Sequence, residues 1–212
     1  MVLIDGKVQE DGPRLAEKPV DNKRVQLTAD FDFASSSFDD FIDLEGQASH
    51  NRSLFYVRGE FWVVVDRINT NQPRTISTLW HWHPEADVKQ YGDATVGSYP
   101  EGSLEIVPVG DASFDIQMIK GQENPEIQGW YSPEYNLYEA NVASIYNSDI
   151  KDTTTFVWLL IPSKGNAERQ ISRAKIIREN QNAIELEVYH NGKNYELSIP
   201  FEDNSFVKFN KK

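Results

Sequence analysis

Short segments of alternating apolar and polar residues recur along almost the whole chain, and they constrain the fold more than any other feature. The clearest pair is AIELEVY and KNYELSI, which flank His190-Asn191-Gly192. Asn-Gly between two such segments is the strongest local signal for a β-hairpin, because both residues accept the positive φ of a tight turn. The segments are spaced roughly ten residues apart, and helical periodicity is almost absent. The sequence therefore predicts an all-β fold, an antiparallel β-sandwich of stacked large sheets with little helix.

The region between His50 and Pro84 provides the predicted centre of this sandwich. Ser53–Val57 and Glu60–Ile68 are predicted to form a hairpin through Arg58-Gly59. Residues 61–65, FWVVV, are apolar at every position. Both faces of this strand are therefore expected to be covered, as in an inner strand of a sandwich.

A further strand of the same region is predicted at Ile76–His83, where Pro84 ends it. Three of the five tryptophans lie in this region. Because the region is predicted to be central, we expect these three indoles to be largely buried: Trp62, Trp80 and Trp82.

The remaining segments complete the predicted sheets. Val25–Phe33 alternates and is predicted to be one half-buried strand. Residues 35–46, SSSFDDFIDLEG, are predicted to form a short serine-capped helix, because Phe38, Phe41 and Ile42 have i, i+3, i+4 spacing. Residues 10–24 are rich in turn formers and charge and are interpreted as a loop. Further strands are predicted at residues 2–9 (two short strands around Asp5-Gly6), 103–109, 114–120, 138–146, 153–161, 171–178 and 206–210.

The length and composition of the chain suit one large β domain or two small ones. A chain of 212 residues with 39% apolar and 12% aromatic residues can bury a substantial core, and no linker or internal repeat is visible, so a single domain over residues 1–212 is predicted. The absence of cysteine excludes disulfides and thiolate metal sites. No run of about 18 apolar residues is present, which excludes a transmembrane helix, and the first residues lack the layout of a signal peptide.

The charge of the chain narrows the class of partner. Acidic residues number 33 and basic residues 21, for a net charge of −12, and no window of the sequence gathers a basic stripe. Nucleic acid is therefore not an expected partner. The same repulsion counts against strong binding of an acidic polysaccharide by this chain alone, although a local arginine cluster could override it.

His81-Trp82-His83 is the one candidate metal motif. Two histidines at i and i+2 on a strand project from the same face, and both imidazoles can then bind one metal ion, with Asp66 or Glu85 as a third ligand. A cupin-type site would place an acid soon after this motif and another histidine on a later strand, and neither is in the expected place. The alternative is that both histidines are polar members of an aromatic strand face, hydrogen-bonded or solvated.

Two further groups of residues are candidate substrate contacts. His50 could act as a general base, and Arg52 could hold a carboxylate or sulfate in bidentate fashion, although a histidine at a strand entry is more often structural. The segment QGWYSPEYNLYE carries Trp130, Tyr131 and Tyr135 next to turn residues. Exposed rings on loops are typical sugar-stacking platforms. Alternatively, the rings close the end of the sandwich core.

Signatures of other enzyme classes are missing from the sequence. No Ser-His-Asp or Cys-His context and no glycine-rich phosphate loop is present. Acids are numerous but scattered, so pairs that could flank a glycosidic bond cannot be ranked from spacing.

Several segments in order resemble the C-terminal β domain of the heparinase II/III-like polysaccharide lyases, a group that includes alginate lyases of similar architecture. They are HNR followed by LFYVRGEFWVVVDRI, then LWHWHP, and later GWYSPEYNLYEANVASIY followed by TTTFVWLLIPS. The resemblance covers nearly the whole chain. It implies an antiparallel β-sandwich joined to an N-terminal α/α toroid that this chain lacks. It further implies cleavage of uronic-acid-containing polysaccharide by β-elimination, in which a base removes the C5 proton while a tyrosine or histidine assists the leaving oxygen.

The resemblance also limits which residues can be given a role. The family's β part begins with a His-x-His-Ala-Asp stretch and an Ala-His-Asn-Thr type segment that runs into a strand like Val2–Gly6. This chain would begin just after that segment, so the resemblance assigns it no catalytic residue and no metal ligand. A structural divalent metal of the family would be held by residues upstream of Val2. His50, His81 and His83 do not match those motifs.

We therefore predict the C-terminal β-sandwich of such a lyase, inactive alone, that forms one wall of the groove for an acidic polysaccharide together with the toroid. Its predicted substrate-binding residues are Arg52, Trp130, Tyr131 and Tyr135, and it needs no cofactor of its own. The resemblance implies a periplasmic or secreted protein. The alternatives are a free-standing carbohydrate-binding β-sandwich and a small metalloenzyme that uses His81 and His83.

Overall fold

The computed structural model describes residues 1–9, 24–165, 172–201 and 206–212, and these residues form strands and no helix. All strand pairs in the sheets are antiparallel. The prediction of an all-β antiparallel sandwich is confirmed. No membrane-spanning helix is found in the part of the chain that the structure describes.

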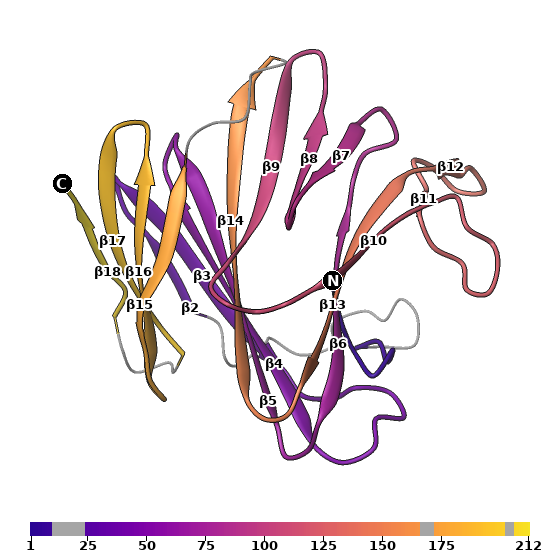
Figure 1. The fold of residues 1–212 in the computed structure, drawn as a ribbon, viewed down its shortest axis with the longest axis horizontal. Coiled ribbons are helices and arrows are strands. Elements are labelled where there is room, and N and C mark those ends of the chain that lie inside the picture. The colour runs from indigo at the N-terminus through magenta and orange to yellow at the C-terminus, as the bar shows by residue number, and fades with distance from the viewer. Residues whose placement is uncertain (10–23, 166–171, 202–205) are drawn as a thin grey trace.

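Three sheets stand side by side in Figure 1. The central sheet has eight strands, in the order β2 (Arg24–Leu27), β3 (Phe31–Phe38), β4 (Ala48–Val57), β5 (Phe61–Thr70), β14 (Thr154–Lys164), β9 (Gly102–Val109), β8 (Ala94–Ser98) and β7 (Asp87–Tyr91).

A four-stranded sheet lies on each side of the central sheet. The N-terminal sheet, on the right in Figure 1, has the order β1 (Val2–Ile4), β6 (Arg74–His81), β13 (Val142–Ile150) and β10 (Asp115–Lys120). The C-terminal sheet, on the left, has the order β15 (Arg173–Glu179), β16 (Ala183–His190), β17 (Lys193–Pro200) and β18 (Lys208–Lys211). A small ribbon of β11 (Trp130–Tyr131) and β12 (Glu139–Ala140) extends between β10 and β13.

Each side of the central sheet buries its own apolar core. Odd-numbered residues of β5 (Phe61, Val63 and Val65) pack toward the C-terminal sheet, whereas Val64 and Ile68 pack toward the N-terminal sheet. The same alternation occurs in β14. Phe156 and Trp158 pack toward the N-terminal sheet, and Val157, Leu159 and Ile161 pack toward the C-terminal sheet. The prediction that FWVVV is covered on both faces is confirmed, and the alternation of Cβ directions along a strand explains it.

The turns at the predicted hairpins have the backbone that their residues favour. Asn191 and Gly192 have φ of 50° and 76°, and Asp5 and Gly6 have φ of 51° and 73°. Both pairs fit a turn that needs positive φ at two successive positions. After Asp5-Gly6 the chain forms only one bridge, between Ile4 and Lys7, in place of the second short strand that was predicted there.

The predicted helix over residues 35–46 is wrong. The first residues of this segment, as far as Phe38, continue β3, and the rest forms turns and bends. Ser35, Ser36 and Ser37 suit an extended strand opposite β4, because they alternate along a strand between the two faces. The helical spacing of the aromatic residues is satisfied instead by a turn, in which the rings of Phe38 and Phe41 meet edge to face at 5.5 Å.

Three other predictions need correction. Val25–Phe33 is a hairpin of β2 and β3 and not one strand, because the Thr28 hydroxyl accepts a hydrogen bond from the amide of Phe31 and closes a turn. In β2, Val25 and Leu27 are 63% and 70% exposed. The β7–β8 hairpin had not been predicted. β6 ends at His81, so His83 lies beyond the strand.

The tryptophans of the central region agree with their predicted burial. Trp82 is buried, at 5% exposure, and Trp62 and Trp80 are partly buried. Gly97 of β8 lies directly under the Trp82 ring, where a Cβ atom would come within 2.2 Å of it.

The interpretation of residues 10–24 as a loop falls almost entirely outside the described residues.

Candidate functional site

Asp66 of β5 is completely buried, with a side-chain exposure of 0%, and it is the centre of the first candidate site. Arg52, directly opposite it on β4, donates from Nε and Nη2 to the two carboxylate oxygens at 2.6 and 2.9 Å. His50 Nε2 lies 2.7 Å from Oδ1, and the indole Nε1 of Trp158 donates to Oδ2 at 3.0 Å. Every oxygen of this buried carboxylate is therefore hydrogen-bonded.

These hydrogen bonds keep Asp66 ionised. Burial alone would raise its pKa, but the hydrogen bonds from His50 and Arg52 and the charge of Arg52 outweigh burial and lower the pKa to about 2. The Arg52 guanidinium also lies over the Trp80 ring, 5.8 Å from its centroid. The arginine is thus fixed on one side by a carboxylate and on another by an aromatic ring.

A depression of about 320 Å³ opens beside this ion pair. Arg52 and His50 line it together with Ser36, Ser37 and Gln9. The amide of Gln9 lies 3.4 Å from His50 Nδ1, the ring nitrogen that does not face Asp66. Arg52 is 26% exposed and uses Nε and Nη2 on Asp66, so its Nη1 is the group that this pair leaves for a ligand.

The predicted roles of His50 and Arg52 differ in how well the geometry suits them. His50 was placed at a strand entry, but it lies inside β4, which begins at Ala48, and it is only 5% exposed. Its two ring nitrogens face Asp66 and Gln9, which is the environment of a structural histidine. Arg52 keeps an exposed edge in a depression that Ser36, its cross-strand neighbour, also lines, an arrangement that can bind a carboxylate or sulfate.

The three predicted aromatic contacts lie on residues 121–141, which we call the aromatic segment. Trp130 is partly buried, donates from Nε1 to the carbonyl of Gln122 at 2.9 Å, and packs edge to face on Tyr138 at 5.2 Å. Tyr131 is 38% exposed, with its ring 5.3 Å from that of His83, and Tyr135 is 92% exposed. The Trp130 ring thus packs within the segment, whereas the Tyr135 ring is open to a ligand.

Charge restricts what the aromatic segment can bind. It contains Glu123, Glu126, Glu134 and Glu139, all exposed, and no lysine or arginine. Carboxylates without compensating cations repel an acidic chain. Arg52 contacts Asp66 and Trp80, and none of the three predicted rings lines the depression beside it.

The candidate metal pair, His81 and His83, has other partners in the structure. His81 and His83 are both exposed; His81 Nε2 pairs with Gln128 Oε1 at 3.0 Å, and His83 Nδ1 lies 3.9 Å from Glu85 Oε2. Asp66, the other suggested ligand, is saturated by its own neighbours. The described ranges contain no group of three or more His, Cys, Asp or Glu side chains that could hold a metal ion.

A second ionic cluster joins the central and C-terminal sheets. Glu60, in the turn between β4 and β5, accepts from Lys193 Nζ at 2.7 Å and from Asn191 Nδ2 at 3.2 Å. Burial would raise the pKa of Glu60, but these hydrogen bonds outweigh it and lower the pKa to about 2. His190 lies beside it, and burial lowers the pKa of that imidazole. The cluster fixes one hairpin on another, and its residues do not line the cavities described here.

The sequence model of the family described as "Heparinase II/III-like, C-terminal" matches residues 2–188. The chain belongs to this family.

Relatives of this heparinase II/III-like domain are much longer proteins. A heparin-sulfate lyase of Bacteroides stercoris is 27% identical over 157 residues, which cover 70% of this chain and 22% of that protein. The crystal structure of a heparan sulfate lyase HepC mutant from Pedobacter heparinus superposes with a TM-score of 0.69 at 17% identity, covering 87% of this chain and 28% of that one. A heparinase III structure gives a TM-score of 0.67 at 15% identity, covering 84% and 28%. The heparinase II/III-like domain therefore spans less than a third of the length of these relatives.

One local feature of the sequence predicts part of the Asp66 site of this heparinase II/III-like domain: the turn between β4 and β5. The turn at Arg58-Gly59 fixes the register of the β4–β5 hairpin and thereby places Arg52 opposite Asp66. The third donor, Trp158, lies 92 residues from Asp66 in sequence, and no local pattern connects the two.

Proposed function

We propose that this chain is the C-terminal β-sandwich of a polysaccharide lyase that cleaves uronic-acid-containing polysaccharide by β-elimination, and that it is inactive alone. The family match over residues 2–188 carries the proposal. The names of the relatives, which are lyases of heparin or heparan sulfate, support an acidic glycan as the substrate. The chain's small share of their length supports a partner domain, the helical toroid, that supplies the catalytic groups.

The contribution of this domain to the substrate is an anion contact through Arg52. Asp66 and Trp80 hold the guanidinium in place, so little side-chain entropy is lost when a ligand binds. The Arg52–Asp66 pair is neutral as a whole, so Arg52 attracts an anion through hydrogen bonds at short range more than through long-range charge. This agrees with a net charge of −12, which gives the chain no general affinity for polyanions.

The activity assay follows the unsaturated uronate that β-elimination produces, by its ultraviolet absorbance, on heparan sulfate, alginate and chondroitin. The chain alone is expected to give no product with any of them, beside a full-length heparin or heparan sulfate lyase as the positive control. Turnover by the chain alone would contradict its proposed inactivity. The gene sequence upstream of Val2 tests whether the chain is part of a longer lyase. We expect it to encode a helical toroid and a His-x-His-Ala-Asp segment.

A periplasmic or secreted location is part of the same proposal, since an extracellular polysaccharide has to be reached. Fractionation of the native host, with an antibody against this domain, is expected to place the protein outside the cytoplasm.

The exposed rings of the aromatic segment favour a second candidate, a free-standing carbohydrate-binding sandwich. Tyr135 is 92% exposed and next to other open side chains, Leu137 and Tyr138. Glycan binding that is lost in Tyr135→Ala and kept in Tyr91→Ala, a matched exposed tyrosine on β7, would favour this candidate. Tyr135 is a better probe than Trp130, because the Trp130 indole also holds the segment together.

A further inference from the structure

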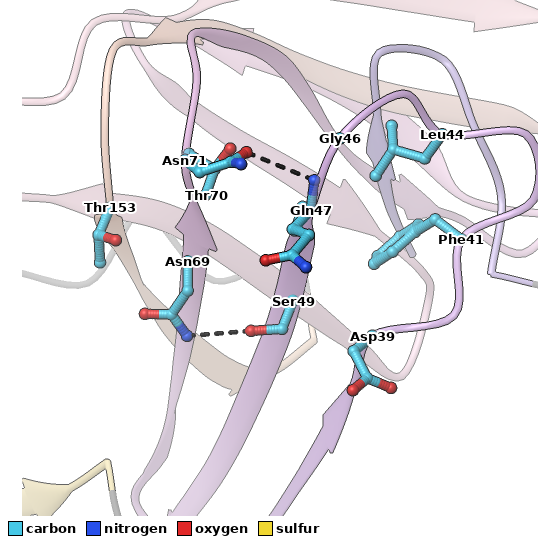
Figure 2. A pocket seen from close by; sticks show the side chains of 11 residues that line it. Asp39, Phe41, Leu44, Gly46, Gln47, Ser49, Asn69, Thr70, Asn71 and Thr153 are labelled. Atoms are coloured by element: carbon cyan, nitrogen blue, oxygen red, sulfur yellow. Dashed lines mark hydrogen bonds between the residues drawn. The ribbon is translucent and has the colours of Figure 1, made fainter.

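A cavity lies at the open end of the β4–β5 hairpin, away from Arg52 and from the aromatic segment. Its volume is about 560 Å³, within the range of roughly 300 to 1,000 Å³ that is usual for small-molecule sites. Figure 2 shows it between the ends of β4 and β5 and the loop that follows β3. We call it the amide pocket, after the side chains on the strand side: Gln47, Ser49, Asn69 and Asn71.

The strand side of the amide pocket is built by two cross-strand positions. Ser49 pairs with Asn69, and the hydroxyl of Ser49 accepts from Asn69 Nδ2 at 3.1 Å. One step further out, Asn71 Oδ1 accepts from the backbone amide of Gln47 at 3.4 Å. These contacts leave Asn69 Oδ1, Asn71 Nδ2 and the whole Gln47 side-chain amide without a partner among the described residues, and Figure 2 shows these groups along one wall.

The pocket wall lies where the side chains along both strands change from apolar to polar. On the same face of β5, Val63 and Val65 are buried under the C-terminal sheet, whereas Arg67 and Asn69 follow at the next two positions. In β4 the face changes in the same way, from Phe55 to Ser49. On both strands this face turns polar toward the open end of the hairpin, where Ser49 and Asn69 line the pocket.

The opposite wall of the amide pocket is apolar with a single charge. Phe41 and Leu44 belong to or pack on the core beneath the N-terminal sheet, and they line the pocket. Asp39 is exposed at the rim, and Thr153 adds a hydroxyl on the far side. Among the residues that line the pocket, Asp39 carries the only charge, and it is negative.

We propose that the amide pocket is a subsite for an uncharged sugar residue, a hexose or an N-acetylhexosamine. Amides and hydroxyls both donate and accept hydrogen bonds, as sugar hydroxyls do, and the apolar wall can pack against the C–H face of a pyranose ring. The Asp39 carboxylate can accept from vicinal hydroxyls and repels uronate and sulfate. The inference does not depend on the proposed lyase activity, and it names a ligand class that differs from the anion expected at Arg52.

The experiment follows the side-chain amide signals of the ¹⁵N-labelled chain by NMR during titration with cellobiose and with N,N′-diacetylchitobiose. Shifts are expected for the amide groups of Gln47, Asn69 and Asn71 with at least one of these disaccharides, and not with glucuronate or inorganic sulfate. Gln47→Ala and Thr153→Val are expected to weaken binding about threefold to tenfold, the effect of one lost hydrogen bond. Both side chains make no hydrogen bond to another described residue, so the fold should be kept.

Gln117→Ala is the matched control, because Gln117 is an exposed amide on β10 that lies outside the pocket. It is expected to bind as the wild type does. If neither disaccharide moves the pocket signals, or if glucuronate or sulfate moves them equally, the proposal is wrong. Either result leaves the lyase proposal untouched, since that is tested by the uronate assay.

Discussion

Asp66 keeps a full charge in the interior because three neighbouring side chains donate to its two oxygens. It also connects two elements of the core, since Arg52 comes from β4 and Trp158 from β14. A buried ion pair adds little net stability compared with an apolar pair of similar shape, but removal of one partner leaves the other uncompensated. Asp66 is therefore needed for stability, even though the Arg52–Asp66 pair adds little net stability itself.

Asp66→Asn is expected to lower the free energy of unfolding by about 3 to 5 kcal/mol, because it breaks a hydrogen-bonded ion pair whose carboxylate is fully buried and leaves the partly buried Arg52 guanidinium without its counter-ion. Urea unfolding followed by tryptophan fluorescence measures the loss. Asp32→Asn is the matched control, since Asp32 pairs with Arg58 on the surface and its loss is expected to cost less than about 1 kcal/mol. Equal effects in both variants would contradict the central role of Asp66.

The pH dependence of stability follows from the same residue. The pKa of Asp66 is about 2 in the folded chain against 3.8 for the ordinary group, so the folded state favours the ionised form. The stabilisation is present above pH 3.8 and is lost as the pH falls through about 2. In Asp66→Asn, the loss of stability that comes from protonation of Asp66 is expected to be missing. Urea unfolding midpoints measured at neutral and at acid pH, for the variant and the wild type, check this.

At the scale of elements, β8 packs against the residues after β6 because Gly97 has no side chain that would collide with the Trp82 ring. Trp82 lies across Gly97, its Nε1 donates to Ser144 Oγ at 2.7 Å, and Asn141 Nδ2 donates to its carbonyl at 2.6 Å. This indole therefore holds the β7–β8 hairpin against the N-terminal sheet.

Gly97→Ala is expected to destabilise the domain by about 1 to 3 kcal/mol, because the new methyl group overlaps the Trp82 ring and the indole has to move. Thermal unfolding and the near-ultraviolet signal of tryptophan report the change. Ser98→Ala, one position along the same strand, is the control and is expected to have little effect. A Gly97→Ala variant with wild-type stability would mean that Trp82 does not lie over β8.

The sequence predicted those elements whose own residues carry the signal. Asn191-Gly192 and the FWVVV strand were predicted because turn chemistry and burial on two faces are local properties. The β7–β8 hairpin was missed because its buried residues are small, Ala94, Thr95 and Gly97, and the apolar group that covers them is Trp82 from another segment. The helix was predicted in error because the spacing of Phe38 and Phe41 also suits a tight turn.

The candidate sites follow the same rule. Arg52 could be selected by its type and position, but its partner across the hairpin depends on register, and Trp158 depends on the stacking of distant strands. The amide pocket needs residues from three separate segments, so neither Asn69 nor Thr153 had a signal of its own. A role for Trp130, Tyr131 and Tyr135 in substrate binding stays a prediction.

At the scale of the whole molecule, the three sheets share their cores, and the central sheet depends on both neighbours. The core on the C-terminal side joins aromatic residues of β3, β4 and β5 with Leu186 and Leu197 of β16 and β17. A chain that ends after residue 165 would leave that face of the central sheet in contact with water.

Such a truncated chain, residues 1–165, is expected to bind the dye ANS strongly and to associate, since it exposes rings that include Phe33, Phe55 and Phe61. ANS fluorescence and sedimentation velocity measure both effects. The full chain is the reference and is expected to bind little dye. A soluble, monomeric truncated form with low ANS fluorescence would show that the C-terminal sheet is not needed to cover this face.

The position of β14 in the central sheet also has a consequence for synthesis. β14 lies between β5 and β9, so it joins two half-sheets, β2 to β5 and β9 to β7, that are complete much earlier in the chain. While the ribosome makes the residues between β9 and β14, both half-sheets have an open edge and cannot pair with each other. Contacts of such long sequence separation form slowly, and open edges pair readily with other chains. Nascent domains on neighbouring ribosomes are therefore most prone to aggregate in the interval before residues 154–164 emerge.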